Sequence, residues 1–377
     1  MTTLERRIQN PGQKRLLALD GGGIRGMITV EILAKIEREL RDKLGADDDF
    51  VLADYFDYVG GTSTGAIIAT CLSLGWPVDK IRQFYLKSGG EMFVKAGFFR
   101  RFRNKFRKQK LEDLLKRELE DEASGQPVTL GSEKLRTLLM VVMRNATTDS
   151  PWPISNNPFA KYNGRDRADC NLNFPLWQLV RASTAAPTYF PPEVIEVGNK
   201  QFIFVDGGVT TYNNPAFQLF LMATVEPYNL NWEAGQDKML IVSVGTGTSP
   251  GENNALRPDE MNLLYNAATI PSALMFAALN EQDFLCRSFG DCRYGDFLDR
   301  EIGDMVGQTG PAKPKLFTYV RYNAELTRTG LTKLGLANIT PKNVQKLDSV
   351  KHVKDLQRVG QAVAKRQVKI AHFNGFA

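Results

Sequence analysis

Residues 57–69 read DYVGGTSTGAIIA, and they place the pattern Gly-x-Ser-x-Gly around Ser63. An aromatic and β-branched run precedes the pattern, and a run of small residues suited to a helix follows it. This order predicts a strand, a sharp turn and a helix, with the serine hydroxyl exposed at the turn. The helix N-terminus would offer free N–H groups and the positive end of its dipole. The alternative is a plain Gly/Ser/Thr-rich turn without chemistry.

The segment before this pattern repeats the order of strand, glycine loop and helix. Residues 15–20 read as a short buried strand that runs into GGGIRG at residues 21–26. Residues 27–44 then carry apolar side chains at helical spacing, and Gly45 ends the predicted helix. A strand, a glycine loop and a helix N-terminus together predict a cradle for an anion.

Three interpretations of this cradle compete. The loop fits the Gly-x-Gly-x-x-Gly of dinucleotide binding, but no acidic residue closes a clear second strand about 20 residues further on. A structural turn is the second interpretation. The third is an oxyanion hole, whose backbone N–H groups hold the negative oxygen formed when a serine attacks an ester. The serine pattern about 40 residues later favours the oxyanion hole.

Strands and helices alternate from residue 15 to residue 248, which predicts an α/β fold with a mostly parallel, doubly wound sheet flanked by helices. We interpret residues 1–13 as a loose N-terminal arm and residues 14–250 as the main domain. Residues 145–173 are expected to be irregular. Residues 251–377 are predicted to form a mainly helical C-terminal region, packed on the same domain, with a strand-like run at residues 315–320.

The composition is that of a globular protein, with 377 residues, 43% hydrophobic and 24% charged. No apolar run approaches the ~18 residues that span a bilayer. The N-terminus lacks the apolar segment of a signal peptide, so we expect a cytoplasmic protein. No Cys-x-x-Cys spacing is present, so we expect idle buried thiols, with a pairing of the last two left open, at Cys71, Cys170, Cys286 and Cys292.

Positive charge is concentrated in a basic insert at residues 91–115. Residues 95–110 hold eight Lys/Arg and no Asp/Glu, within a net charge of +6. Phenylalanines recur every four residues there, and on a helix they would form an aromatic stripe edged with cations, as in segments that lie on anionic lipid. Packing on the core and nucleic-acid binding are the alternatives. The candidate lipid contacts are Phe98, Phe102, Phe106, Arg100, Arg101 and Arg103.

A serine nucleophile needs a base within hydrogen-bond reach. The chain has only His352 and His372, which lie in the charged C-terminal region and suit a helix surface or a tail. Asp206 is a better candidate, because it ends an apolar strand where parallel sheets place ligands, and two glycines follow it. A carboxylate bonded to Ser63 can accept the proton, particularly where burial raises its pKa. An Asp-Gly-Gly turn without chemistry is the alternative.

Taken in order, DGGGIRG at residues 20–26, GTSTG at residues 61–65 and DGG at residues 206–208 resemble the hallmarks of the patatin-like phospholipase family. The resemblance covers residues 14–250. It implies a Ser63–Asp206 dyad that hydrolyses lipid acyl esters through an acyl-enzyme, without a metal or other required cofactor. It also implies that Arg25 steadies the loop or the anion, and that the oxyanion donors are Gly21, Gly22 and Gly23.

The C-terminal region resembles the bacterial patatin-like effectors of anti-phage defence, through residues 282–287, 295–299 and 321–323. This resemblance implies a membrane phospholipid substrate, action at the inner face of the membrane and activation by a cyclic nucleotide such as a cyclic dinucleotide. We also expect a homo-oligomer that does not bind nucleic acid. The alternative functions are an esterase or thioesterase of other substrates, and a catalytically silent ligand-binding module.

Overall fold

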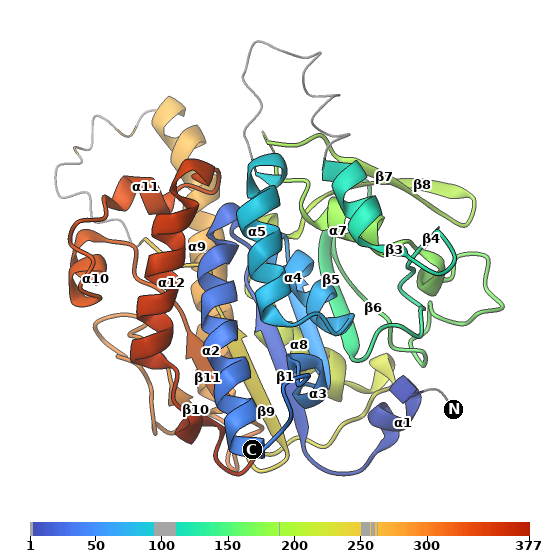
Figure 1. The fold of residues 1–377 in the computed structure, drawn as a ribbon, viewed down its shortest axis with the longest axis horizontal. Coiled ribbons are helices and arrows are strands. Elements are labelled where there is room, and N and C mark those ends of the chain that lie inside the picture. Colours follow the sequence, from blue (N-terminus) through green and yellow to red (C-terminus); the bar gives the residue numbers. More distant parts are fainter. Residues whose placement is uncertain (1–2, 94–110, 188, 250–256, 258–260, 262) are drawn as a thin grey trace.

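A mixed sheet of nine strands forms the centre of the described part of the chain (Figure 1). The computed structural model describes residues 3–93, 111–187, 189–249, 257, 261 and 263–377. The sheet has the order β10-β11-β9-β1-β2-β5-β8-β7, with β6 also paired to β5. A separate short hairpin joins β3 and β4. The strands are β1 (Lys14–Leu19), β2 (Tyr58–Thr62), β3 (Glu120–Asp121), β4 (Gln126–Pro127), β5 (Leu138–Asn145), β6 (Ser150–Ser155), β7 (Glu193–Val197), β8 (Lys200–Asp206), β9 (Met239–Val244), β10 (Asp291–Tyr294) and β11 (Thr318–Tyr322).

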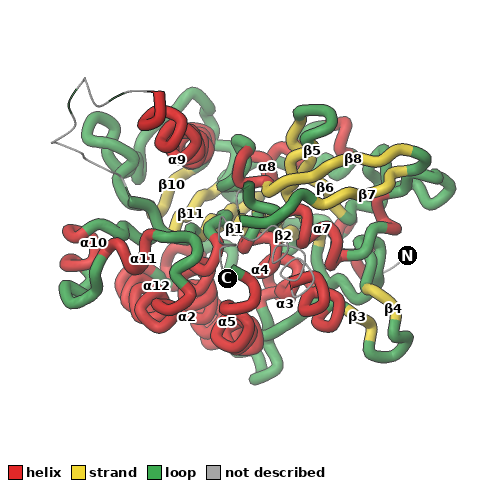
Figure 2. Tube along the Cα trace, turned by 90° about the horizontal axis from the view of Figure 1, so that it is seen from above, coloured by secondary structure: helices red, strands yellow, loops and turns green. Residues whose placement is uncertain are grey.

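Helices cover both faces of this sheet (Figure 2). On one face lie α2, α4, α5, α7 and α12, and on the other lie α8 and α9. Residues 111–118 are also helical. The helices are α1 (Thr3–Gln9), α2 (Gly26–Leu44), α3 (Leu52–Tyr55), α4 (Thr64–Ser73), α5 (Val78–Met92), α7 (Leu176–Ser183), α8 (Ala216–Thr224), α9 (Leu263–Phe289), α10 (Arg328–Lys333), α11 (Pro341–Gln345) and α12 (Val353–Gln367).

The central strands are buried on both faces, which explains their nearly continuous apolar sequences. In β1, Leu17 and Leu19 pack in the core under α2, whereas Leu16 and Ala18 pack in the core under α8. The strands from β10 to β5 run parallel to one another. The predicted doubly wound α/β architecture is therefore confirmed, with antiparallel strands added at the β7 end.

The C-terminal region is helical, as predicted, but it also completes the sheet. Its strands β10 and β11 extend the sheet beyond β9, and β11 pairs with β9 in parallel. Its helix α12 packs along α2 (Figure 1). The predicted boundary at residue 250 therefore does not separate two folding units, because the hydrophobic core on each face of the sheet includes residues from both sides of it.

Two predictions about irregular segments were wrong. Residues 1–13 are not a loose arm, because α1 forms there and Arg7 donates hydrogen bonds to Asp57 and to the carbonyls of residues 53, 54 and 56. Residues 145–173 include β6, which pairs with β5 although it contains Pro151 and Pro153. Proline cannot donate to a strand ladder, so it is found mainly in edge strands, and β6 has only one partner among the described strands.

Candidate active site

Ser63 lies at the sharp turn between β2 and α4, as the sequence predicted. Its backbone has φ 55° and ψ −121°, a conformation that costs energy in any residue with a side chain. Gly65 lets the following helix approach β1, because a Cβ at this position would lie 2.2 Å from the Leu19 carbonyl oxygen. The second glycine of the pattern is therefore required by packing, while the strained turn holds the serine at the carboxyl end of β2.

Asp206 reaches the same place by a route that the sequence did not predict. β8 runs antiparallel to β5, so Asp206 does not end a parallel strand. β2 pairs with residues 138–142 of β5, and β8 pairs with residues 143–145. Both lie on the edge of β5 that β6 leaves open, because β6 occupies residues 140–145 from the other side. The strands β2 and β8 thus meet with their carboxyl ends together, at Thr62 and Asp206.

The two side chains are in direct contact at this meeting point. Ser63 Oγ donates a hydrogen bond to Asp206 Oδ2 at 2.7 Å. The Gly208 N–H donates to Asp206 Oδ1, also at 2.7 Å. Burial raises the pKa of Asp206 to about 6, although both hydrogen bonds act in the opposite direction. The site therefore holds a buried carboxylate with increased basicity against a serine hydroxyl.

Ser183, at the end of α7, positions the turn, and the sequence analysis did not select it. Its hydroxyl accepts a hydrogen bond from the Ser63 N–H at 2.9 Å and donates one to the Val142 carbonyl oxygen at 2.6 Å. The Ser183 hydroxyl therefore connects the turn at Ser63 to β5. The run of small residues at 182–186, just before the strand of Asp206, is the sequence signal that could have indicated a close contact.

The glycine loop lies beside Ser63, but its three N–H groups are not equivalent. The Gly21 N–H donates to the Asn213 carbonyl oxygen at 3.1 Å, so the prediction that it binds an oxyanion was wrong. Within the described residues, the N–H groups of Gly22 and Gly23 donate to no protein acceptor. They precede α2, so the positive end of the α2 dipole adds to them. The loop therefore offers two donors.

Arg25 holds this loop in shape. Its Nε donates to the Gly22 carbonyl oxygen at 3.4 Å and its Nη1 to the Gln345 carbonyl oxygen at 3.3 Å. Burial lowers the pKa of Arg25 to about 10, which leaves it charged at neutral pH. The Ile24 N–H also donates to Leu347 in the C-terminal region, at 3.0 Å. The loop is thus fixed partly by residues far outside the motif.

A buried ion pair fixes the residue that precedes the loop. Arg321 on β11 donates to both carboxylate oxygens of Asp20, at 2.8 and 2.5 Å, and also to the Ser243 hydroxyl. Both charged side chains are at most 2% exposed. Sequence reasoning missed this pair, because its members lie 301 residues apart.

The remaining predictions concern residues away from Ser63. His352 pairs with Asp355, and His372 stacks on Tyr294. All four cysteines are buried and free. No helix in the described ranges is long and apolar enough to cross a bilayer, and no His/Cys/Asp/Glu group there could hold a metal ion. The predicted lipid contacts lie outside the described residues: Phe98, Arg100, Arg101, Phe102, Arg103 and Phe106.

Comparison with known proteins identifies the family of this chain. The family model for patatin-like phospholipase matches residues 17–220, just over half of the chain. The chain therefore belongs to the patatin-like phospholipase family and is a lipid acyl hydrolase by class. This confirms the family predicted from the three motifs.

Individual relatives come from bacteria and plants. The chain is 32% identical over 262 residues to a cGAMP-activated phospholipase of Vibrio cholerae. The aligned residues make up 66% of this chain and 68% of that protein. It is 28% identical to Patatin-T5 of Solanum tuberosum, over 62% of this chain and 60% of that protein. The solved structure of VipD from Legionella pneumophila aligns with a TM-score of 0.40 and 14% identity, covering 95% of this chain and 67% of that one.

Proposed function

We propose that this protein hydrolyses the acyl esters of membrane phospholipids, with Ser63 as nucleophile and Asp206 as base. The observation that carries the proposal is the 2.7 Å hydrogen bond between Ser63 Oγ and Asp206 Oδ2. The glycine loop beside Ser63 has two N–H groups, those of Gly22 and Gly23, that donate to no protein acceptor among the described residues. Nucleophile, base and oxyanion donors are the three parts that acyl transfer requires. The two side chains and the loop supply them without a cofactor.

In the first half of the reaction, Asp206 accepts the Ser63 proton while Oγ attacks the ester carbonyl carbon. The negative charge that develops on the carbonyl oxygen is stabilised by the N–H groups of Gly22 and Gly23. Asp206 then gives its proton to the leaving lysophospholipid alcohol, and the acyl group stays on Ser63. In the second half, Asp206 deprotonates a water molecule that attacks the acyl-enzyme, and a fatty acid leaves as Ser63 recovers its proton.

Regulation by a cyclic nucleotide is part of the proposal. It is supported by the similarity to a protein named as a cGAMP-activated phospholipase. A role in anti-phage defence and action at the inner face of the membrane belong to the proposal through the resemblance of the C-terminal region to the anti-phage effectors. The basic insert at residues 91–115 is the proposed lipid contact. Self-association stays a prediction, which light scattering of the purified protein would test.

The experiment is fatty-acid release from anionic liposomes, with and without a panel of cyclic dinucleotides. Wild type is compared with Ser63→Ala and Asp206→Asn, and Ser73→Ala serves as a control because Ser73 is a buried serine at the other end of α4. We expect release by wild type and the control, and loss of at least about 10³-fold in the two site variants. Turnover of short esters without liposome hydrolysis would indicate a soluble esterase. No turnover of either substrate would leave the ligand-binding module.

A further inference from the structure

The side chain of Asn213 lies beside both members of the Ser63–Asp206 dyad. A Cβ on Gly21 would lie 2.3 Å from Asn213 Oδ1 and 3.3 Å from Ser63 Cβ. A Cβ on Gly208 would lie 3.0 Å from Asn213 Oδ1 and also 3.0 Å from Asp206 Oδ1. The two glycines therefore make room for the Asn213 amide oxygen between the nucleophile and the base.

The backbone on both sides of the Asn213 side chain is fixed to the active site. The Tyr212 carbonyl oxygen accepts a hydrogen bond at 2.6 Å from Thr62 Oγ1, in the residue before Ser63. The Asn213 carbonyl oxygen accepts the Gly21 N–H at 3.1 Å. A side chain whose backbone is held at two points is preorganised, so it needs little ordering before it acts on a reactant.

The Asn213 amide oxygen is an unused hydrogen-bond acceptor. Asn213 is only 8% exposed, and its Oδ1 is buried without a hydrogen-bond donor among the described residues. Buried polar groups in proteins are nearly always satisfied, so an unpaired acceptor beside a nucleophile indicates a donor that a reactant supplies. Water is such a donor, and the second half of the proposed reaction consumes it. The oxyanion is itself an acceptor, so Oδ1 does not stabilise it.

The acyl-enzyme changes the hydrogen bonds of Asp206. In the free enzyme Asp206 Oδ2 accepts from Ser63 Oγ, but an acylated Oγ has no proton to donate. Oδ2 is then free to accept one hydrogen of a water molecule, while Oδ1 keeps the Gly208 N–H. The second hydrogen of this water needs an acceptor of its own, because two fixed hydrogens aim the oxygen lone pair at the acyl carbon.

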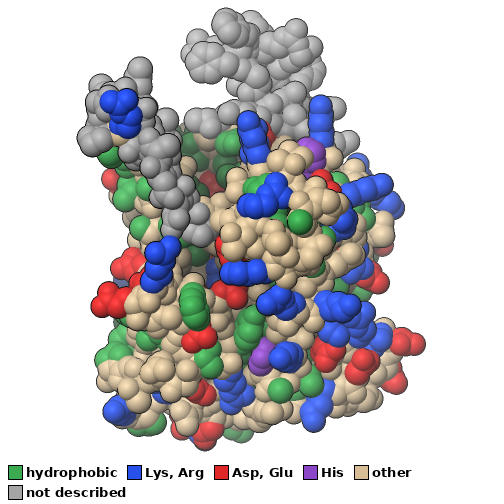
Figure 3. Space-filling model, turned by 90° about the vertical axis from the view of Figure 1, so that its left-hand side faces the viewer, with side chains coloured by type: hydrophobic (Ala, Val, Ile, Leu, Met, Phe, Trp, Pro, Cys, Tyr) green, Lys and Arg blue, Asp and Glu red, His purple; other side chains and the backbone are tan. Residues whose placement is uncertain are grey.

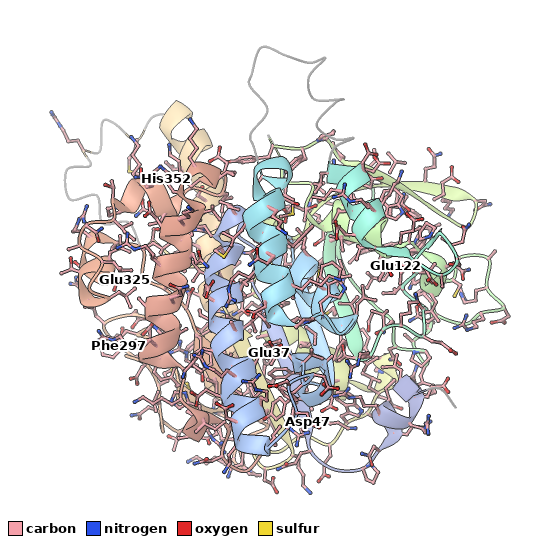
Figure 4. All side chains as sticks on the ribbon, viewed as in Figure 1. Glu37, Asp47, Glu122, Phe297, Glu325 and His352 are labelled. Carbon is pink, nitrogen blue, oxygen red and sulfur yellow. The ribbon has the colours of Figure 1, made fainter. Side chains whose placement is uncertain are left out.

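The two imidazoles of the chain have other partners. His352 lies at the upper end of α12 in Figure 4, where it pairs with Asp355. His372 is hydrogen bonded to Tyr322. Both histidines are visible on the surface in Figure 3, where they are purple. The acceptor for the second hydrogen is therefore sought beside the dyad itself, where the Asn213 amide oxygen lies.

We propose that Asn213 Oδ1 positions the water molecule that hydrolyses the acyl-enzyme. The water donates one hydrogen bond to Asn213 and gives its other proton to Asp206 as its oxygen bonds to the acyl carbon. The bond from that carbon to Ser63 Oγ then breaks, and Oγ takes the proton from Asp206. The hydrogen that faced Asn213 leaves on the carboxyl group of the fatty acid. This inference rests on the proposed function, because it assigns a residue to the second half of that reaction.

The test separates deacylation from acylation in full-length Asn213→Ala, under conditions in which the wild type is active. Release of nitrophenol from p-nitrophenyl butyrate gives both rates, and mass spectrometry of acid-quenched enzyme gives the fraction acylated on Ser63. We expect steady-state turnover to fall at least about tenfold, because a water without its second hydrogen bond is misaligned. The acylated fraction should rise, and the first release of nitrophenol should stay within about twofold of the wild-type rate.

Three further variants control for effects on the fold. Asn213→Leu removes the acceptor but keeps the shape of the side chain, so it repeats the test if the alanine variant is unstable. Asn213→Asp keeps an acceptor oxygen in place and should accumulate clearly less acyl-enzyme than Asn213→Ala. Asn163→Ala removes another buried asparagine with an unpaired Oδ1, in the loop after β6, and should leave the acylated fraction at the wild-type level.

Three results would overturn the inference. The first is an unchanged acylated fraction and turnover in Asn213→Ala. The second is an equal fall in acylation and turnover, which would mean that the amide supports the oxyanion or the fold. The third is as much acyl-enzyme in Asn213→Asp as in Asn213→Ala. Each of them, with an active wild type, leaves the proposed function standing. A wild type that neither acylates Ser63 nor releases fatty acid from any substrate would remove the proposed function and this inference together.

Discussion

The carboxyl group of Asp206 sets the pH dependence of the proposed reaction. Burial raises its pKa to about 6, and the base must be ionised to accept the Ser63 proton. We therefore expect kcat/KM for a short ester to fall about tenfold per pH unit below pH 6 and to level off above it. A pH–rate profile measures this, with a stability check at each pH as the control. An acidic limb near 4 would contradict the buried-base assignment.

The same burial predicts that Asp206 destabilises the fold. Its pKa is about 6 in the folded protein, above the ordinary aspartate value of 3.8, so the folded state favours the protonated form. Below pH 4 the carboxyl group is protonated in both states and its burial costs little. As the pH rises through 6 the buried group has to ionise, and the free energy of unfolding falls by up to about 3 kcal/mol. Urea unfolding should show Asp206→Asn more stable than wild type at pH 8, with the difference vanishing towards pH 4.

Asp79→Asn is the matched control for this stability measurement. The Asp79 side chain is 80% exposed, so its replacement should change the free energy of unfolding little at either pH. A loss of stability in Asp206→Asn at pH 8 would mean that the carboxylate contributes hydrogen bonds that outweigh its burial.

At the scale of elements, the position of the glycine loop depends on the loop after β9, which packs against it. A Cβ on Gly22 would lie 2.1 Å from Thr246 Oγ1, the hydroxyl that holds the Gly21 carbonyl. We expect Gly22→Ala to displace the loop and to lower kcat about 10²–10³-fold, the size of effect that follows loss of an oxyanion donor. Short-ester turnover measures the fall in kcat, and near-UV circular dichroism of the same samples measures the change in tertiary packing.

Gly90→Ala is the control for the loop variant. Gly90 lies in α5, where the nearest atom to an added Cβ is Val350 Cγ1 at 3.7 Å, an ordinary contact. Alanine there should keep the activity and stabilise the helix slightly. Equal activity in Gly22→Ala and wild type would show that this loop does not bind the oxyanion.

At the scale of the whole molecule, the Asp20–Arg321 pair ties the C-terminal region to the active site. Removing one partner leaves the other charge buried without compensation, which typically costs about 3–5 kcal/mol. We expect Arg321→Met to lose about this much stability, and Asp20→Asn with Arg321→Met to lose clearly less than the sum of the single changes. Urea unfolding of the four proteins gives the coupling energy.

The exposed pair Arg41–Asp48 provides a control double-mutant cycle on the surface. Its coupling energy should stay below about 1 kcal/mol. Additive effects at Asp20 and Arg321 would contradict the structural link between the two parts of the chain.

The sequence by itself determined the local geometry of this protein. The turn at Ser63, the glycine loop before α2 and the helix end at Gly45 follow from steric rules and periodicities that act within a few residues. These features were therefore predictable, as were the family and the α/β class. β7 and α8 were not predicted, because β7 is a short edge strand and α8 is apolar on nearly every side under α9.

Only the tertiary structure decided how distant segments meet. It brings the carboxyl ends of β2 and β8 together on one edge of β5, occupies the Gly21 N–H with Asn213, and joins Asp20 to Arg321. The physical reason is that such contacts depend on which strands pair and in which direction. That choice is made by burial of the whole sheet, and no window of neighbouring residues contains it.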